Sequence, residues 1–167
     1  MEALGRLFNI ASVISPQDLA GSPVTGTRVR VREGEGVAFV YFAGAGTAGE
    51  DVTLDVQEHN ADTGGTSRDL DVVTRWFSKR AVALDNSETW VKHTQAAASE
   101  VDLGDDEGEN TVLAVVEVSS KSLSDGFEWV SVNATDPGPT AGKLGCVIAL
   151  VYDLHAQRSP ELLAALL

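Results

Sequence analysis

Residues 28–32 read Arg-Val-Arg-Val-Arg, and residues 52–57 read Val-Thr-Leu-Asp-Val-Gln. In both stretches apolar and polar side chains alternate, which is typical of a β-strand with one buried face and one face toward solvent or a partner. The same period runs through residues 37–41, 72–77 and 90–94, and clusters of turn-forming residues separate these segments. The alternation therefore predicts an all-β fold.

Two further segments are apolar almost without interruption. Residues 112–118 read Val-Leu-Ala-Val-Val-Glu-Val, and residues 145–152 read Gly-Cys-Val-Ile-Ala-Leu-Val-Tyr. Runs of this kind are typical of strands that are covered on both faces. We expect these segments to be the core strands of a jelly roll or a related antiparallel β-sandwich with about eight to ten strands.

The length of 167 residues suits one domain, and we find no repeat and no Pro-rich or Ser-rich linker. We expect an N-terminal arm or short helix over residues 1–26, the β-sandwich over residues 27–155, and a C-terminal arm or short helix over residues 156–167. The terminal arms would therefore be short helices or extended segments attached to the sandwich.

Both terminal segments carry apolar side chains that need to be kept from water. Leu4, Leu7 and Phe8 fall at helical spacing, and Ser159 with Pro160 resembles a helix start. Such segments dock either on their own domain or on a neighbouring subunit. For the second case, the expected contact residues are Leu4, Leu7, Phe8, Ile10, Leu162, Leu163 and Leu166.

The net charge of −13 and the isoelectric point near 4.4 argue against direct binding to nucleic acid or to an anionic membrane. The first residues form neither an export signal nor a membrane span. Cys146 is the one cysteine, so no internal disulfide forms, and its apolar surroundings predict a small buried side chain. We expect folding in a reducing compartment.

The motifs for enzymatic chemistry are weak. Gly44, Gly46 and Gly49 match a dinucleotide-binding fingerprint, but the segment that follows alternates like a strand and opens no helix, which favours a hairpin loop. There is no nucleophile elbow, and the three histidines form no metal-binding pair. We therefore expect no enzymatic activity, no cofactor and no metal site.

Three other features leave alternatives open. The acidic stretch 100–109 is either a solvated loop, which we favour, or a site for a hard cation such as calcium. Trp76 is the tryptophan most suited to an exposed sugar-binding platform, because Trp90 and Trp129 each neighbour a valine in a strand and are expected to be buried.

The third feature is a row of arginines. Arg28, Arg30 and Arg32 share one face of a strand and form a patch for a partner that carries carboxylates. The alternative, which is slightly favoured, is an exposed face with salt bridges to neighbours such as Glu33 and Glu35.

Several segments together resemble a known class of proteins. They are Leu-Gly-Arg-Leu-Phe-Asn-Ile at 4–10, Ala-Gly-Thr-Ala-Gly-Glu-Asp at 45–51 with the strand at 52–59, Thr-Gly-Gly-Thr-Ser-Arg-Asp-Leu at 63–70, residues 88–95, and Arg-Ser-Pro-Glu at 158–161. Together they resemble small virion structural proteins of tailed bacteriophages that act as head decoration or cement proteins.

The resemblance implies a sandwich or jelly-roll subunit, often a trimer, that binds between major capsid protein subunits and stabilises the head. The location would be the virion capsid, assembled in the cytoplasm of the bacterial host. Two alternatives remain at this stage. One is a carbohydrate-binding β-sandwich, and the other is a different head or tail component of a phage.

Overall fold

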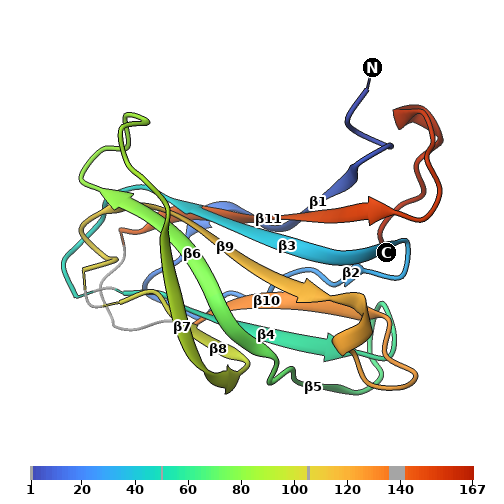
Figure 1. Cartoon of the computed structure of the whole chain (residues 1–167). Coiled ribbons are helices and arrows are strands. Elements are labelled where there is room, and N and C mark those ends of the chain that lie inside the picture. The colour runs from blue at the N-terminus through green and yellow to red at the C-terminus, as the bar shows by residue number, and fades with distance from the viewer. Residues whose placement is uncertain (1, 50, 105, 136–141) are drawn as a thin grey trace.

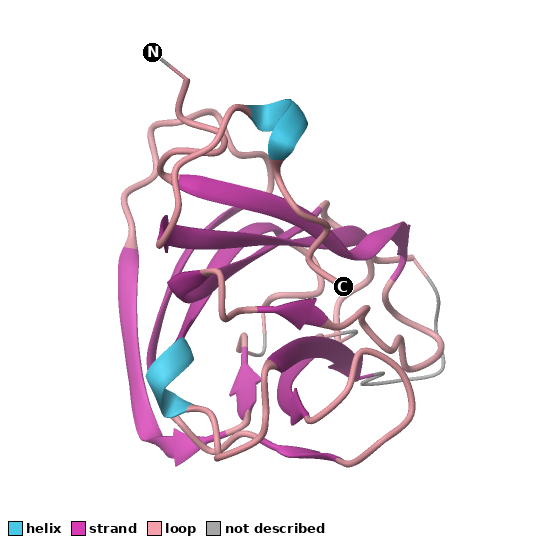
Figure 2. Ribbon diagram, turned by 90° about the vertical axis from the view of Figure 1, so that its right-hand side faces the viewer, coloured by secondary structure: helices cyan, strands magenta, loops and turns pink. Residues whose placement is uncertain are grey.

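The computed structural model describes residues 2–49, 51–104, 106–135 and 142–167. Within these residues, two antiparallel sheets pack face to face, so the all-β sandwich predicted from the sequence is confirmed (Figure 1). Figure 2 shows helix only as two short turns, η1 (Ser120–Ser122) and η2 (Pro160–Leu162). Among the described residues, no helix has the length and apolar character that crossing a membrane requires.

Sheet A has six strands, and sheet B has four in its main path plus one short strand beside it. The order in sheet A is β1 (Phe8–Asp18), β11 (Leu144–Leu154), β3 (Gly34–Ala43), β9 (Thr111–Ser119), β6 (Val73–Ala81) and β7 (Val91–Ala98). The order in sheet B is β2 (Val29–Arg30), β10 (Trp129–Thr135), β4 (Thr53–His59) and β5 (Ser67–Asp69), while β8 (Glu100–Asp102) also pairs with β4.

The strand order is that of a jelly roll with an insertion. Strands β1, β11, β3 and β9 interleave along the chain with β2, β10, β4 and β5, as in the two four-stranded sheets of that fold. Along the chain, the segment from β6 to β8 is inserted between β5 and β9. Its strands β6 and β7 extend sheet A beyond the edge of sheet B. The loop with Gly44, Gly46 and Gly49 crosses from β3 in one sheet to β4 in the other, so the expectation of a hairpin loop was wrong.

The core lies between the sheets and follows the predicted alternation. In β3, Val37, Phe39 and Tyr41 point inward and are fully buried. From sheet B, alternate residues of β4 and β10 meet them, among them Leu54 and Val132. Mostly valine-sized side chains fill this space, as expected for strands with high β-propensity.

The N-terminal segment is not helical. Residues 8–18 form the edge strand β1, paired with β11 from Phe8 opposite Tyr152 onward. The Ser15-Pro16 pair has the residue types of a helix start, but it lies inside this strand. It lies where the register of β1 shifts, between Ile14 and Gln17, and an edge strand with irregular pairing tolerates proline.

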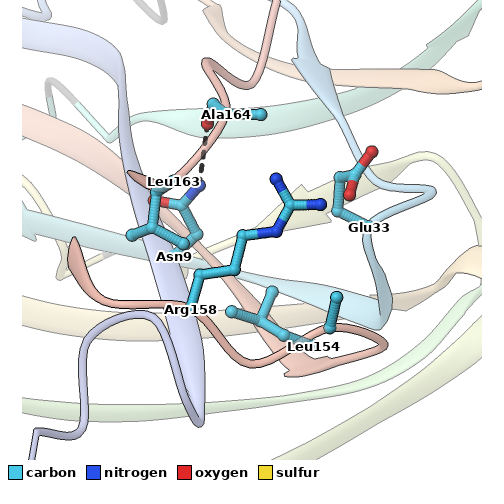
Figure 3. A pocket seen from close by; sticks show the side chains of 7 residues that line it. Asn9, Glu33, Leu154, Arg158, Leu163 and Ala164 are labelled. Atoms are coloured by element: carbon cyan, nitrogen blue, oxygen red, sulfur yellow. Dashed lines mark hydrogen bonds between the residues drawn. The ribbon is translucent and has the colours of Figure 1, made fainter. Parts of the chain in front are cut away.

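The terminal segments lie side by side at one end of the sandwich (Figure 1). The amide of Arg158 donates to the carbonyl of Gly5 at 2.8 Å, and the amide of Asn9 donates from Nδ2 to the carbonyl of Ala164 at 3.2 Å (Figure 3). The small pocket drawn in Figure 3 holds about 20 Å³, room for one water molecule. It is a packing seam between the two ends of the chain.

Candidate docking surface

The outer face of sheet A is apolar across five neighbouring strands. Alternate residues of these strands point away from the core, and none of the apolar ones is covered by sheet B. The face consists of Ile10 from β1, Leu144, Cys146, Ile148 and Leu150 from β11, Ala38, Val40 and Phe42 from β3, Leu113 and Val115 from β9, and Phe77 from β6. We call this set the apolar face.

Strand register makes the apolar face continuous. Across three strands, Phe42 lies between Cys146 and Leu113. One step along, Val40 lies between Ile148 and Val115, and Val115 lies opposite Phe77. Directly opposite side chains in an antiparallel sheet contact one another, so these residues form a single surface.

Water reaches much of this surface. Phe42 is 48% exposed and Ile148 is 37% exposed. Phe77 and Val115, together with Trp90 just before β7, line a hollow of about 350 Å³ at one end of the face. Trp90 is itself 48% exposed, so the face offers both flat aliphatic area and an aromatic recess.

Charged groups of both signs lie around the apolar face. Nζ of Lys79 lies 5.1 Å from the centre of the Trp90 ring, a cation–π distance. Lys92 is exposed opposite Phe77, and Arg75 and Glu117 line a neighbouring polar pocket. At the far end of β11, Asp18 lies opposite Leu144. Three cations and at least two anions therefore border this face of a chain whose net charge is −13.

The outer face of sheet B has the opposite character. Its outward positions on β4 and β10 are Thr53, Asp55, Gln57, His59, Trp129, Ser131, Asn133 and Thr135, all polar except Trp129. Nε2 of Gln57 donates to Asp55 at 3.0 Å and to Asp69 at 3.3 Å, so the polar groups of this face bind one another. The two sheets thus share one core and differ on their outer sides.

The apolar residues predicted to contact a partner divide into three groups. Ile10 belongs to the apolar face, and Phe8 lies beside it, opposite Tyr152. Leu7 and Leu162 are exposed where the chain ends meet, and there Leu4 and Leu163 are half-buried.

Leu166 forms the third group. It is 7% exposed and packs in the core, and its carbonyl accepts from the amide of Arg30 at 2.9 Å. The expectation that Leu166 contacts a partner is therefore wrong. The C-terminal segment packs on its own sandwich instead.

The three predicted arginines are occupied within the chain. Arg28 donates to the carbonyls of Ala61 and Gly64 at 2.8 and 2.7 Å. Arg30 and Arg32 both bind Glu128, at 2.6 and 3.2 Å. The salt bridges thus involve Glu128 from the neighbouring strand region, and the expected bridges to Glu33 and Glu35 do not occur.

Two of the three tryptophans have the opposite exposure to the one predicted. Trp76 is 4% exposed and stacks on His93 with the ring centres 3.8 Å apart, so it offers no platform for a sugar. Trp90 is exposed, as described above. Trp129 is half-buried, with the guanidinium carbon of Arg30 5.2 Å from its ring centre.

A buried charged cluster closes the end of the sandwich opposite the chain termini. Lys143 and Glu107 are both fully buried and form an ion pair at 3.1 Å. The hydroxyl of Tyr41 donates to the same carboxylate at 2.5 Å, and the amide of Val52 donates to it at 3.0 Å. Lys143 also donates to three backbone carbonyls, those of Glu107, Gly108 and Asn110.

This cluster has a structural role. Burial lowers the pKa of Lys143, and the nearby Glu107 carboxylate offsets part of that effect. Burial, together with the charge of Glu107, raises the pKa of the Tyr41 hydroxyl. Because every member is out of contact with water, no substrate reaches the cluster. The expectation of a solvated acidic loop was wrong for Glu107.

Two serine–histidine contacts bring together side chains of the kinds that act in catalysis. Ser78 and Nε2 of His93 lie 2.9 Å apart in a hollow of about 340 Å³. His59 lies 2.8 Å from both Ser67 and Ser131. In the described part of the chain, neither imidazole donates a hydrogen bond to an acidic side chain, as a catalytic triad would require.

No metal centre is formed by the described ranges 2–49, 51–104, 106–135 and 142–167, which contain no group of three or more His, Cys, Asp or Glu side chains placed to hold an ion. Cys146 is free and half-buried on the apolar face, and the prediction that it is buried was wrong.

Sequence reasoning missed most of the apolar face, although a signal for it exists. The continuous apolar runs 112–118 and 145–152 were interpreted as strands covered on both faces. In the structure, sheet B covers one face of each strand, and the second face is open. The sequence therefore predicts a second packing partner for these strands, and among the described residues of the single chain no other element packs on the apolar face.

Comparisons with protein-family models, with curated protein sequences and with solved structures find no match to this chain.

Proposed function

We propose that this protein is a structural subunit of a phage virion, a head decoration protein that binds the lattice of the major capsid protein and stabilises the shell. Its contribution is a folded surface for attachment, and catalysis has no part in it. The proposal combines the sequence resemblance with one structural observation, the apolar face of sheet A.

The apolar face supports attachment because its composition is that of an interface core. Large exposed apolar patches on a folded domain mark sites where another molecule binds. Charged side chains are depleted at the centre of interfaces and found at the rim, and the apolar face has this distribution. A subunit on a shell is present in many copies, so even a modest contact of this kind holds the array in place.

The carbohydrate-binding alternative has lost its main support. It depended on Trp76 as an exposed platform, and this residue is buried against His93. The exposed Trp90 has Lys79 over its ring, which occupies a face that a sugar would need.

The test is co-sedimentation of the full chain with empty phage heads whose decoration sites are vacant. We expect the chain to pellet with heads in a fixed ratio to the capsid protein. Phe42→Lys places a charge on the apolar face and should reduce occupancy at least tenfold. Gln57→Lys, on the outer face of sheet B, is the matched control and should bind like the unmodified chain.

Circular dichroism and thermal unfolding establish that both variants are folded. No binding of the unmodified chain to heads would overturn the decoration role, and binding to tails alone would assign it to another virion position. Equal occupancy by Phe42→Lys and the unmodified chain would exclude the apolar face from the attachment.

A further inference from the structure

We infer that the apolar face of sheet A is covered by the same face of a second copy of this chain, so that the working unit is a pair packed sheet to sheet. The inference rests on the proposed function only in taking the protein as an assembly subunit. It places the second copy, and not the shell, on the apolar face, so the pair attaches to the shell through its other surfaces, and Phe42→Lys lowers head occupancy by separating the pair.

The first argument is shape. An apolar sheet surface is buried best by another sheet surface, since two twisted sheets pack at about 10 Å with their side chains interdigitated. Within the described residues, the other sheet surface open to solvent is the outer side of sheet B, which is polar. A two-fold axis through the apolar face pairs it with an identical surface, which is the common way for like chains to associate.

The second argument is area. The eleven side chains of the apolar face, each occupying about 4.8 Å by 7 Å of the sheet, cover roughly 370 Å² in projection. The relief of the side chains increases the accessible area above that value. Specific interfaces begin near 500 Å² on each partner, so the apolar face is large enough for a pair of modest stability.

The third argument is charge. Two chains of net charge −13 repel each other over most orientations. The apolar face contains no charged side chain at its centre, and its border carries Lys79, Lys92 and Arg75 together with Glu117 and Asp18, so the border charges nearly balance. This is therefore a surface where two copies approach at low electrostatic cost. Added salt screens the remaining repulsion, so the pair should tighten as ionic strength rises.

Cys146 provides a direct probe of the cover. It is the single cysteine of the chain, and it lies half-buried on the apolar face opposite Phe42. The experiment measures mass by light scattering and the rate of Cys146 alkylation by N-ethylmaleimide, both between about 1 and 200 μM, a range that brackets the weak affinity expected of a small interface.

We expect a mass that rises from one chain to two, with alkylation at least tenfold slower at the high concentration. Ile148→Lys should stay at one chain, and its alkylation rate should not depend on concentration. Gln57→Lys, on sheet B, should behave like the unmodified chain. The thermal unfolding of each variant shows that it is folded.

Three outcomes would overturn the inference. They are a mass of one chain with rapid alkylation throughout, a mass of three chains, and pairing that Ile148→Lys leaves intact. If the chain is single in solution and Cys146 is protected only on phage heads, the shell itself covers the apolar face, and the proposed function stands without the pair. If the pair forms and no head binding occurs, the proposed function fails and the pair remains.

Discussion

The two outer faces of this sandwich differ although both sheets contribute to the same core. On sheet B, the outward side chains of β4 and β10 are mostly polar and bind one another, as Gln57 does with Asp55 and Asp69. On sheet A, the outward side chains of β3, β9 and β11 are mostly apolar, with Glu117 at the border, and Phe42 is 48% exposed. The polar groups on the outer face of sheet B find partners within the chain, whereas the apolar side chains on the outer face of sheet A remain exposed.

The difference separates what folding needs from what assembly needs. A sheet in a two-layer sandwich requires one apolar side for its core, and the second side is usually polar because it faces water. Sheet B follows this rule. Sheet A departs from it over five adjacent strands, and folding of the single chain gives no reason for the departure. We attribute the apolar face to selection for contact with another molecule.

The largest effect is expected where the sheets are joined. Lys143→Met leaves the Glu107 carboxylate buried without its cation, and breaking a buried pair in this way costs roughly 3–5 kcal/mol. Chemical denaturation at neutral pH measures the free energy of unfolding. The exposed pair of Lys121 and Glu35 is the control, and Lys121→Met should lower the free energy of unfolding far less, because water already screens this pair.

This prediction bears on the comparison because Glu107 is bound both by Tyr41 of sheet A and by the amide of Val52, next to β4 of sheet B. Loss of the cluster should loosen both sheets and therefore both outer faces. Equal costs for Lys143→Met and Lys121→Met would show that the cluster does not hold the sheets together.

The sequence contained most of the fold. Alternation predicted the strands around Val29, Phe39 and Leu54, because period two is visible without knowledge of the partners. Of the two expectations for residues 1–26, an arm or a short helix, the helix was wrong: Leu4, Leu7 and Phe8 satisfy a helical spacing locally, whereas pairing with β11 makes residues 8–18 a strand of the sandwich. Such pairing joins residues more than a hundred positions apart, and no local pattern reveals it.

Trp76 shows how a small irregularity reverses a prediction. Val73 and Trp76 both point inward although they are three positions apart, which strict alternation forbids. The register of β6 against β7 shifts between Val73 and Arg75, and this bulge turns Trp76 into the core. A bulge depends on the neighbouring strand, so it left no mark in the sequence.

The candidate surface was only half predictable. The continuous apolar runs predicted two covers for β9 and β11, whereas sheet B supplies one and leaves the second face open. A sequence does not say whether a cover comes from the same chain. Lys143 and Glu107 were missed for a similar reason. They lie in Gly-rich and acidic segments that are typical of solvated loops, and only the fold brings them together.

The second prediction concerns the polar side of sheet B. His59 is 3% exposed between Ser67 and Ser131, and burial with the nearby charge of Arg28 lowers its pKa from 6.5 to about 4. Above pH 6.5 the imidazole is neutral in both the folded and unfolded states. Between pH 6.5 and 4 the unfolded chain takes up a proton that the folded chain refuses, so stability falls by about 3 kcal/mol as the pH drops.

His59→Gln removes this proton uptake while an amide can still bind the two serines. The measurement is the free energy of unfolding from pH 7.5 to 4 for both chains, and the difference between the two curves isolates His59 from the acidic groups. His155→Gln, at an exposed histidine, should retain the full slope. Parallel curves for the unmodified chain and His59→Gln would mean that the folded state does not lower the pKa of His59.

The smallest effect is expected on the apolar face itself. At about 1 μM, Ile148→Thr should change the free energy of unfolding by less than about 1 kcal/mol, because its side chain packs on one side only. Val147→Thr, at the neighbouring and fully buried residue, places a hydroxyl in the core and should cost about 1–3 kcal/mol.

At about 200 μM the unfolding temperatures of the two variants should respond differently to concentration. A pair that forms only between folded chains raises the unfolding temperature with concentration, so Val147→Thr should retain this rise and Ile148→Thr should lose it. If Ile148→Thr costs as much as Val147→Thr at low concentration, the outer side of sheet A supports the fold of the single chain, and the contrast between the two faces would no longer point to assembly.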